Sequence, residues 1–233
     1  MEFDLENIKF RLLEKRVFDV NRRMFGSESH EYKSYPISRI DIVDFETKYK
    51  IDLPTSYKLF LEKIGYGAGP DYGLFNLQQI EDEIFTLTEL NAEENVLLSP
   101  ANPFPFKQSD IDNLNERIKQ GEKNPQALTP LLENYFPCDG CIPISHQGCT
   151  YWTCLVVTGE LKDTVWNVAC FEGFTGYWSP AKYTSISDGS FYQLISFENW
   201  YLEWLDEATF SSRFFSNILD KSWNTIRNLF VKA

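Results

Sequence analysis

The sequence predicts a mixed fold in which α-helices and β-strands occupy different stretches of the chain. Apolar residues recur at helical spacing before residue 65 and again after residue 195. Between them, segments within 141–172 are rich in β-branched and aromatic residues and are bounded by Gly and Asp, which favours strands. Two of these strands are joined by the short connection GELKDT, so we expect an antiparallel hairpin.

The first helix is predicted over residues 4–18, with an apolar stripe of Leu5, Ile8, Leu12, Leu13 and Val17. The polar connector GSESHEYKSYP follows, and its His30 is expected to be solvated. Ser38 with Asp41 predicts a capping pair at the start of the next helix. The residues expected to form the buried face of that helix are Ile40, Val43 and Leu53 or Phe45.

A third helix is predicted from Pro54, which suits a first turn because its missing N–H is not needed there. Tyr57, Phe60, Leu61 and Ile64 repeat at one-turn spacing, and Gly65 is expected to end this helix in a left-handed conformation. The segment GYGAGPDYG, residues 65–73, predicts tight turns, and LFNLQ after it is a short strand candidate.

Residues 99–137 differ in composition from the rest of the chain. They begin with SPANPFPFKQSD, which carries three prolines, and continue with a polar helix predicted near 109–120 and a break at GEKNPQ, so they are expected to form a long excursion from the core. Strands are then predicted in CIPIS, TYWTCLVVTG and TVWNVACFE. In the second strand, alternate residues on both faces are apolar, so this strand is expected to be central in its sheet.

Two further helices are predicted at the end of the chain. The first runs from Ser196 to about Phe210 and carries aromatic residues on one stripe. The second spans about 212–230, and its apolar face is expected to consist of Phe215, Ile218, Leu219, Trp223, Ile226 and Phe230.

Composition restricts the classes of partner. Thirty-four acidic and 22 basic side chains give a net charge of −12, which opposes binding to nucleic acid or anionic lipid and favours basic proteins. No apolar run is long enough to span a bilayer, and the N-terminus lacks a signal-peptide core. We therefore expect a cytoplasmic protein with no membrane association, and the five cysteines are expected to be reduced.

Three ordered segments resemble the SUKH superfamily, also called the Smi/Knr-type domain. They are IDIVDFETKYKIDLPTSYKLFLEKIGYGAG (40–69), GCIPISHQGCTYWTCLVVTGELKDTVW (140–166) and SFENWYLEWLDEA (196–208). The positions that carry the family pattern, and for which the resemblance implies a structural role, are Phe45, Glu46, Leu53, Pro54, Tyr57, Gly65, Gly148, Trp166 and Trp200.

The resemblance implies an α+β fold with a twisted, mostly antiparallel sheet flanked by helices. On this basis residues 1–233 are expected to form one domain, with a core at about 36–208, an insertion at about 99–137 and an extra C-terminal helix at about 211–233. The insertion and the last helix are longer than the compact family pattern.

The resemblance also implies a role as a bacterial immunity protein that neutralises a cognate polymorphic toxin, often a nuclease, as in toxin–antitoxin pairs and contact-dependent inhibition. A regulatory protein-interaction module is the alternative. Asp71 and Tyr72 in the Gly-rich turn pair an acid with an aromatic ring, as interface anchors do. The acidic residues proposed to join them in contacting a toxin are Glu81, Asp82, Glu83, Glu93 and Glu94, and a merely solvated acidic face is the alternative for these five. Monomer and homodimer both stay open.

An enzyme or a metal protein is the weaker interpretation. His146 and Cys149 could form a nucleophile–base pair, but no third orienting group is evident, and a packed histidine in a tight turn explains the pattern better. Cys138, Cys141, Cys149 and Cys154 with His146 contain one CxxC pair without the second that a zinc site usually has. A redox CxxC is disfavoured because it opens no helix. We therefore expect no catalytic residues, cofactor or metal.

Overall fold

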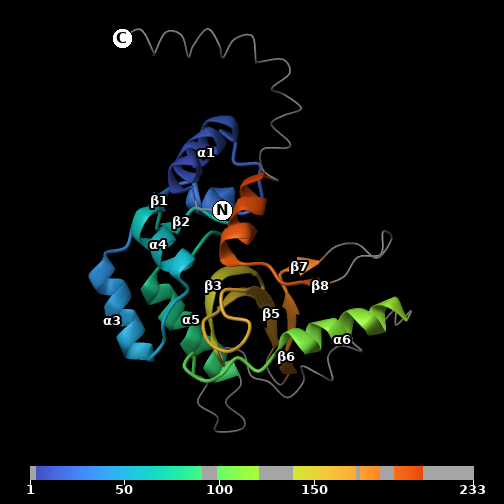
Figure 1. The fold of residues 1–233 in the computed structure, drawn as a ribbon. Coiled ribbons are helices and arrows are strands. Elements are labelled where there is room, and N and C mark those ends of the chain that lie inside the picture. The colour runs from blue at the N-terminus through green and yellow to red at the C-terminus, as the bar shows by residue number, and fades with distance from the viewer. Residues whose placement is uncertain (1–3, 91–98, 121–138, 172–173, 184–191, 207–233) are drawn as a thin grey trace, which may run out of the picture.

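The fold of this protein, taken from a computed structural model, is α+β (Figure 1). The structure describes residues 4–90, 99–120, 139–171, 174–183 and 192–206. The described helices are α1 (Leu5–Phe18), α2 (Ser27–His30), α3 (Arg39–Tyr49), α4 (Thr55–Lys63), α5 (Leu77–Leu90), α6 (Gln108–Lys119) and a helix over 197–206. The short strands are β1 (Ser34–Tyr35), β2 (Tyr66–Gly67), β7 (Lys182–Tyr183) and β8 (Tyr192–Gln193).

The main sheet has four strands in the order β3 (Cys141–Gly148), β4 (Tyr151–Val156), β5 (Val165–Phe171) and β6 (Phe174–Pro180), all antiparallel to their neighbours. This confirms the predicted antiparallel hairpin and the central position of β4. The helices α3, α4 and α5 gather on one side of the sheet, and α6 lies on the other (Figure 1).

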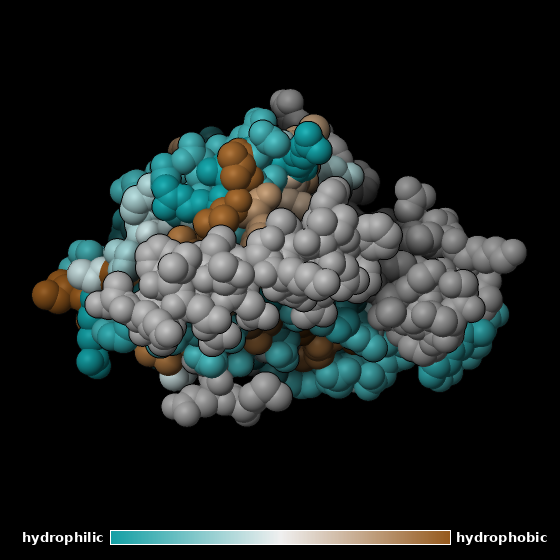
Figure 2. All heavy atoms as spheres, turned by 90° about the horizontal axis from the view of Figure 1, so that it is seen from above, coloured by the Kyte–Doolittle hydropathy of each residue, from teal (hydrophilic) through white to brown (hydrophobic). Residues whose placement is uncertain are grey.

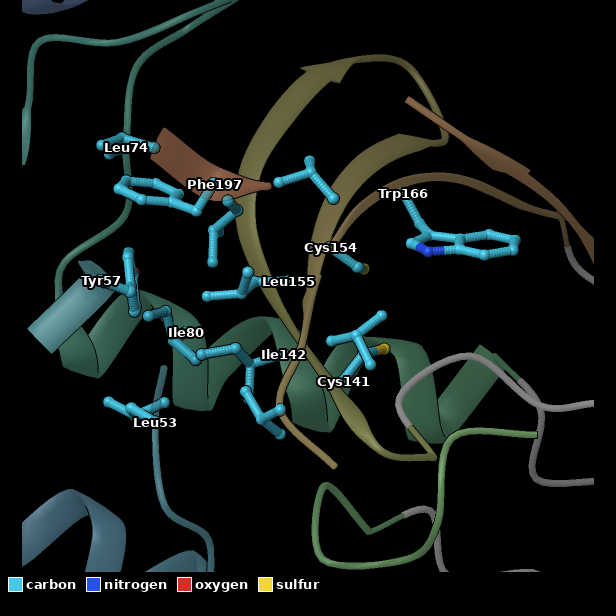
Figure 3. Packing of buried hydrophobic residues seen from close by; sticks show 14 of the residues in the cluster. Leu53, Tyr57, Leu74, Ile80, Cys141, Ile142, Cys154, Leu155, Trp166 and Phe197 are labelled. Carbon is cyan, nitrogen blue, oxygen red and sulfur yellow. The ribbon is translucent and has the colours of Figure 1, made fainter. Parts of the chain in front are cut away.

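Both faces of β4 are buried, as the alternation predicts. Leu155 opposes Ile142 and Val165 in the neighbouring strands, whereas Cys154 opposes Trp166, so the two sets of side chains point to opposite faces. Figure 3 shows Leu155 pointing toward Tyr57 and Ile80, with Trp166 on the other side of the strand. The buried apolar side chains of the described residues, from Ile8 to Leu205, form one connected cluster.

The turn that joins α3 to α4 depends on a carboxylate rather than on packing alone. Oε1 of Glu46 accepts a hydrogen bond from the backbone N–H of Leu53 at 2.7 Å and lies 3.1 Å from Nζ of Lys58. Leu53 is fully buried, so its N–H would otherwise lack a partner. Pro54 is the N-cap of α4, one residue before the predicted first turn.

Other local predictions are confirmed at the backbone. The Ser38 hydroxyl accepts from the Asp41 N–H at the start of α3. Gly65 has φ +98° and donates to the Phe60 carbonyl, which ends α4 in a left-handed conformation. An added Cβ at Gly65 would lie 1.8 Å from the Tyr35 carbonyl oxygen, so only glycine fits between α4 and β1.

Several side-chain predictions are wrong. Leu13 and Val17 on α1 are 57% and 52% exposed, and Ile40 and Val43 on α3 are 72% and 48% exposed. Each of these helices carries apolar residues on two sides, and the buried side is the one that meets a neighbouring element. The LFNLQ strand is limited to an isolated bridge at Leu74, and its second half is wrong because Leu77 begins α5. The predicted helix at 212–230 lies outside the described residues.

The first part of the 99–137 segment contributes to the core. Phe106 stacks on Trp166 with ring centroids 5.3 Å apart, and Phe104 meets the same indole edge-on at 5.1 Å. Ile111 and Leu114 of α6 are buried in the same cluster. The polar helix predicted at 109–120 is confirmed as α6, and residues 121–138 lie outside the described residues.

Candidate protein-binding surface

The Gly-rich turn is fixed to the edge of the main sheet. The Phe75 N–H donates to the Ile144 carbonyl of β3 at 2.9 Å, and Leu74 forms an isolated antiparallel bridge with Ser145. The hydroxyl of Ser145 is buried and donates to the Gly73 carbonyl at 2.9 Å. A turn held by these bonds cannot relax into solvent without leaving buried polar groups unpaired.

The tip of this turn holds Asp71 and Tyr72 in a defined conformation. The Gly73 N–H donates to the Pro70 carbonyl at 2.9 Å, which closes a four-residue turn. Asp71 has φ +54°, in the left-handed region that Asp tolerates better than most residues. Gly26 approaches so closely that an added Cβ would lie 1.5 Å from the Asp71 carbonyl oxygen. The loop before α2 therefore supports the turn from its other side.

Aromatic rings surround this tip. Tyr72 meets Phe25 edge-on at 5.3 Å and lies 6.4 Å from the ring of His146, which itself meets Trp152 at 5.2 Å. Phe25 is 64% exposed and Tyr72 is 44% exposed. We call the exposed and half-buried residues at this place the Tyr72 surface, which consists of Phe25, Asp71, Tyr72, His146 and Gly148.

The carboxylate of Asp71 is the electrostatic feature of the Tyr72 surface. Burial raises the pKa of Asp71 to about 6. Within the described part of the chain, no hydrogen bond or ion pair compensates this carboxylate. A desolvated anion without an internal cation is costly, and a cation supplied from outside would remove that cost.

The predicted acidic residues on α5 have partners inside the protein. Glu83 accepts a hydrogen bond from the indole N–H of Trp152 at 2.9 Å, and Glu81 pairs with Lys48 at 2.7 Å. Asp82 is exposed and accepts from the Gln78 side chain. Glu93 and Glu94 lie outside the described residues. The structure thus brings Asp71 and Tyr72 together with Phe25 and His146, and it places the three α5 carboxylates on a separate helix.

The remaining family-pattern positions lie in the core or in turns. Phe45, Tyr57 and Trp166 are buried, and Tyr57 meets Phe197 edge-on at 4.7 Å. Trp200 is half-buried and lies 6.1 Å from the Phe197 ring. Gly148 has φ +106°, and an added Cβ there would lie 3.3 Å from the Tyr72 ring, so this glycine lets the hairpin approach that ring.

The described side chains considered for catalysis or metal binding have other surroundings. Nδ1 of His146 accepts from the Gly148 N–H at 3.1 Å, and no hydrogen bond joins this ring to Cys149. Cys141 and Cys154 are completely buried in β3 and β4, whereas Cys149 is exposed with φ +51°. Where side chains are described, no three His, Cys, Asp or Glu residues gather as metal ligands. Cys138 lies outside that part.

The structure corrects the sequence interpretation of the other histidine, His30. His30 is 7% exposed rather than solvated, and its Nδ1 accepts from the Tyr32 N–H at 2.9 Å. Its ring meets those of Tyr32 and Trp204 edge-on. Burial lowers the pKa of His30 to about 4, so the ring is neutral at pH 7 and belongs to the packing of α2 against the helix over 197–206.

Sequence reasoning missed Phe25 and Ser145. Phe25 and Met24 are two apolar residues directly before the polar connector that begins at Gly26, and that pair was the available signal. Ser145 gave no signal, because a serine in an apolar strand is common and its partners, Pro70 and Gly73, are more than 70 residues away in the sequence.

An antiparallel sheet flanked by helices, with a Gly-rich turn fixed to its first strand, defines an α+β protein. The chain belongs to the SMI1/KNR4 family (SUKH-1), whose family model matches residues 36–189. This match includes the turn and strands β3 to β5, and it leaves out α1 and the helix over 197–206. Comparisons with curated proteins and with solved structures gave no match.

No described helix is both long enough and apolar enough to cross a bilayer.

Proposed function

We propose that this chain is an immunity protein that binds a cognate polymorphic toxin, of the nuclease type, and neutralises it by contact rather than by catalysis. Membership of the SUKH-1 family supports this class of function. The observation that carries the proposal is the Tyr72 surface, where two exposed aromatic rings contact each other and the residue next to Tyr72 in the fixed turn, Asp71, carries an uncompensated carboxylate. The site of action is the cytoplasm.

The Tyr72 surface has the features of an interface anchor. Aromatic side chains provide large contact areas at low conformational cost, and most of the binding energy of an interface comes from a few such residues. The turn is held by Ser145 and by the backbone of β3, so little ordering is needed on binding. An arginine or lysine of the partner would compensate Asp71.

The charge of the chain favours a basic partner. A nuclease domain presents a cationic surface because it must bind a polyanion. A protein with net charge −12 attracts such a surface over long range and covers it in the complex. Blocking the cationic surface would prevent access of nucleic acid, so inhibition needs no chemistry by this chain.

The test is a search of the neighbouring genes for a large secreted protein with a toxic C-terminal domain, followed by titration of the full chain into that domain, prepared as an inactive variant. We expect a one-to-one complex and full inhibition of the active domain at equimolar ratio. The association rate should fall about tenfold or more between 50 and 500 mM salt, because steering by charge is screened. The control is an unrelated basic protein of similar size.

The proposal is wrong if that domain does not bind, or if the chain binds RNA more tightly than it binds the domain. Absence of any adjacent toxin gene, together with a stable complex with a non-toxin protein, would instead indicate a regulatory interaction module of the Smi/Knr type.

A further inference from the structure

Helix α1 carries a second apolar stripe on the side that faces away from the core. Ile8 and Leu12 are buried, whereas Phe10, Leu13 and Val17 are 55%, 57% and 52% exposed. The exposed three are spaced by three and four residues, so they form one stripe on the opposite side of the helix from the buried pair. Figure 2, which views the end of the molecule where α1 lies in Figure 1, shows hydrophobic side chains exposed among hydrophilic ones.

The described chain ends beside this helix. Asp206, the last described residue, pairs with Arg11 of α1 at 2.6 Å. One turn away, the ammonium of Lys15 lies 5.3 Å above the Trp204 ring. The helix over 197–206 therefore lies along the flank of α1, and the next residue of the chain starts within reach of the exposed stripe.

We propose that residues 207–233 fold back over α1 and cover the stripe of Phe10, Leu13 and Val17. Five residues of extended chain span roughly 16 Å, which is enough to pass around a helix about 10 Å in diameter. The segment from 212 to 230 has the amphipathic pattern described above, so it offers an apolar face of matching character.

The positive charge of residues 207–233 and the small area of the exposed stripe favour this segment over a second copy of the chain as the partner of α1. Residues 207–233 carry four basic and two acidic side chains, for a net charge of +2, whereas the rest of the chain carries −14. Two copies of an acidic protein repel each other. Three half-exposed side chains also offer only roughly 250 Å², far below the ~800 Å² per partner of a stable interface. That small area suffices for a segment already tethered at high effective concentration.

The experiment is hydrogen exchange measured by mass spectrometry on the full chain and on Leu13→Glu, with Ile40→Glu as the matched control on α3. In the unmodified chain, amides of 212–230 should exchange at least tenfold more slowly than an unstructured peptide. Leu13→Glu should remove that protection, because a carboxylate would be buried against the apolar face. Ile40→Glu should leave it unchanged, and strands β3 to β5 should keep their protection in all three proteins.

Three results would overturn the proposal. The amides of 212–230 could exchange at unprotected rates in the unmodified chain, or their protection could survive Leu13→Glu. Protection that disappears on dilution, together with a molecular mass of two chains in light scattering, would assign the stripe to a dimer. If Leu13→Glu also unfolds the sheet, the milder Leu13→Ala replaces it, with at least a threefold loss of protection expected. The outcome does not depend on the toxin proposal.

Discussion

Replacing Asp71 with asparagine is expected to stabilise the free protein and to weaken the complex with the toxin. The folded-state pKa of Asp71, about 6, lies above the ordinary value of 3.8. The folded protein therefore binds more protons than the unfolded chain between about pH 4 and 6, and its stability falls as the pH rises through that window. At pH 7 the variant should be about 1–2 kcal/mol more stable, after allowance for partial exposure of the carboxylate.

The same substitution should cost affinity because the partner's cation would lose its counter-charge in a desolvated contact. Loss of one member of such a pair typically costs 2–5 kcal/mol, so we expect the toxin domain to bind roughly 30-fold to several-thousand-fold more weakly. Urea unfolding at pH 4 and pH 7 and calorimetric titration measure the two effects. Asp44→Asn, on an exposed position of α3, is the control for net charge and should change neither.

The outcome that supports the proposal is a gain in folding stability together with a loss of affinity for the toxin domain. A variant that is both less stable and weaker in binding would mean that Asp71 holds the turn together. A variant that binds as tightly as the unmodified protein would remove Asp71 from the interface.

Trp166→Ala is expected to have the largest effect on stability. The indole is fully buried, stacks on Phe106 and donates its N–H to the Thr164 hydroxyl at 3.0 Å. Removing it leaves a large cavity in a ring cluster, which typically costs 3–5 kcal/mol. A domain of ordinary stability would lose a large part of its folding free energy. The measurement is the urea midpoint at pH 7.

Trp200→Ala is the matched control, because that indole is half-buried and its loss should cost less than half as much. Exchange of α6 amides in Trp166→Ala should rise as well, since Phe104 and Phe106 connect that segment to the indole. Equal losses in the two tryptophan variants would contradict the assignment of the 99–120 segment to the core.

The features of this structure that could be predicted from the sequence are those that depend on residues close together in the chain. The cap at Ser38, the left-handed Gly65 and the central strand β4 depend on residues within a few positions, and all were predictable. Helices α1 and α3 each have apolar residues on two sides, and the side that becomes buried is the one that packs against a neighbouring element. Periodicity alone could not show which side that is.

The residues of the candidate site also divide into those that the local sequence places and those that tertiary contacts place. Asp71 and Tyr72 lie together at the tip of the Gly-rich turn because they are adjacent in the sequence, and their role in binding stays a prediction. Phe25 contacts Tyr72 from 47 residues away, and Ser145 bonds the neighbouring Gly73 from 72 residues away, through tertiary contacts that leave no local pattern. The burial of His30 likewise depends on Trp204, which is far away in the sequence.

The central claim is that the Tyr72 surface binds the toxin, and calorimetric titration of two tyrosine variants tests it most directly. Tyr72 and Tyr35 are 44% and 49% exposed, and the nearest neighbouring ring of each lies at 5.3 Å, so Tyr35 serves as the control, although Tyr72 also lies 6.4 Å from the ring of His146. We expect Tyr72→Ala to raise the Kd for the toxin domain at least 30-fold and Tyr35→Ala to raise it less than threefold. Unchanged affinity in Tyr72→Ala, or equal losses in both variants, would contradict the claim.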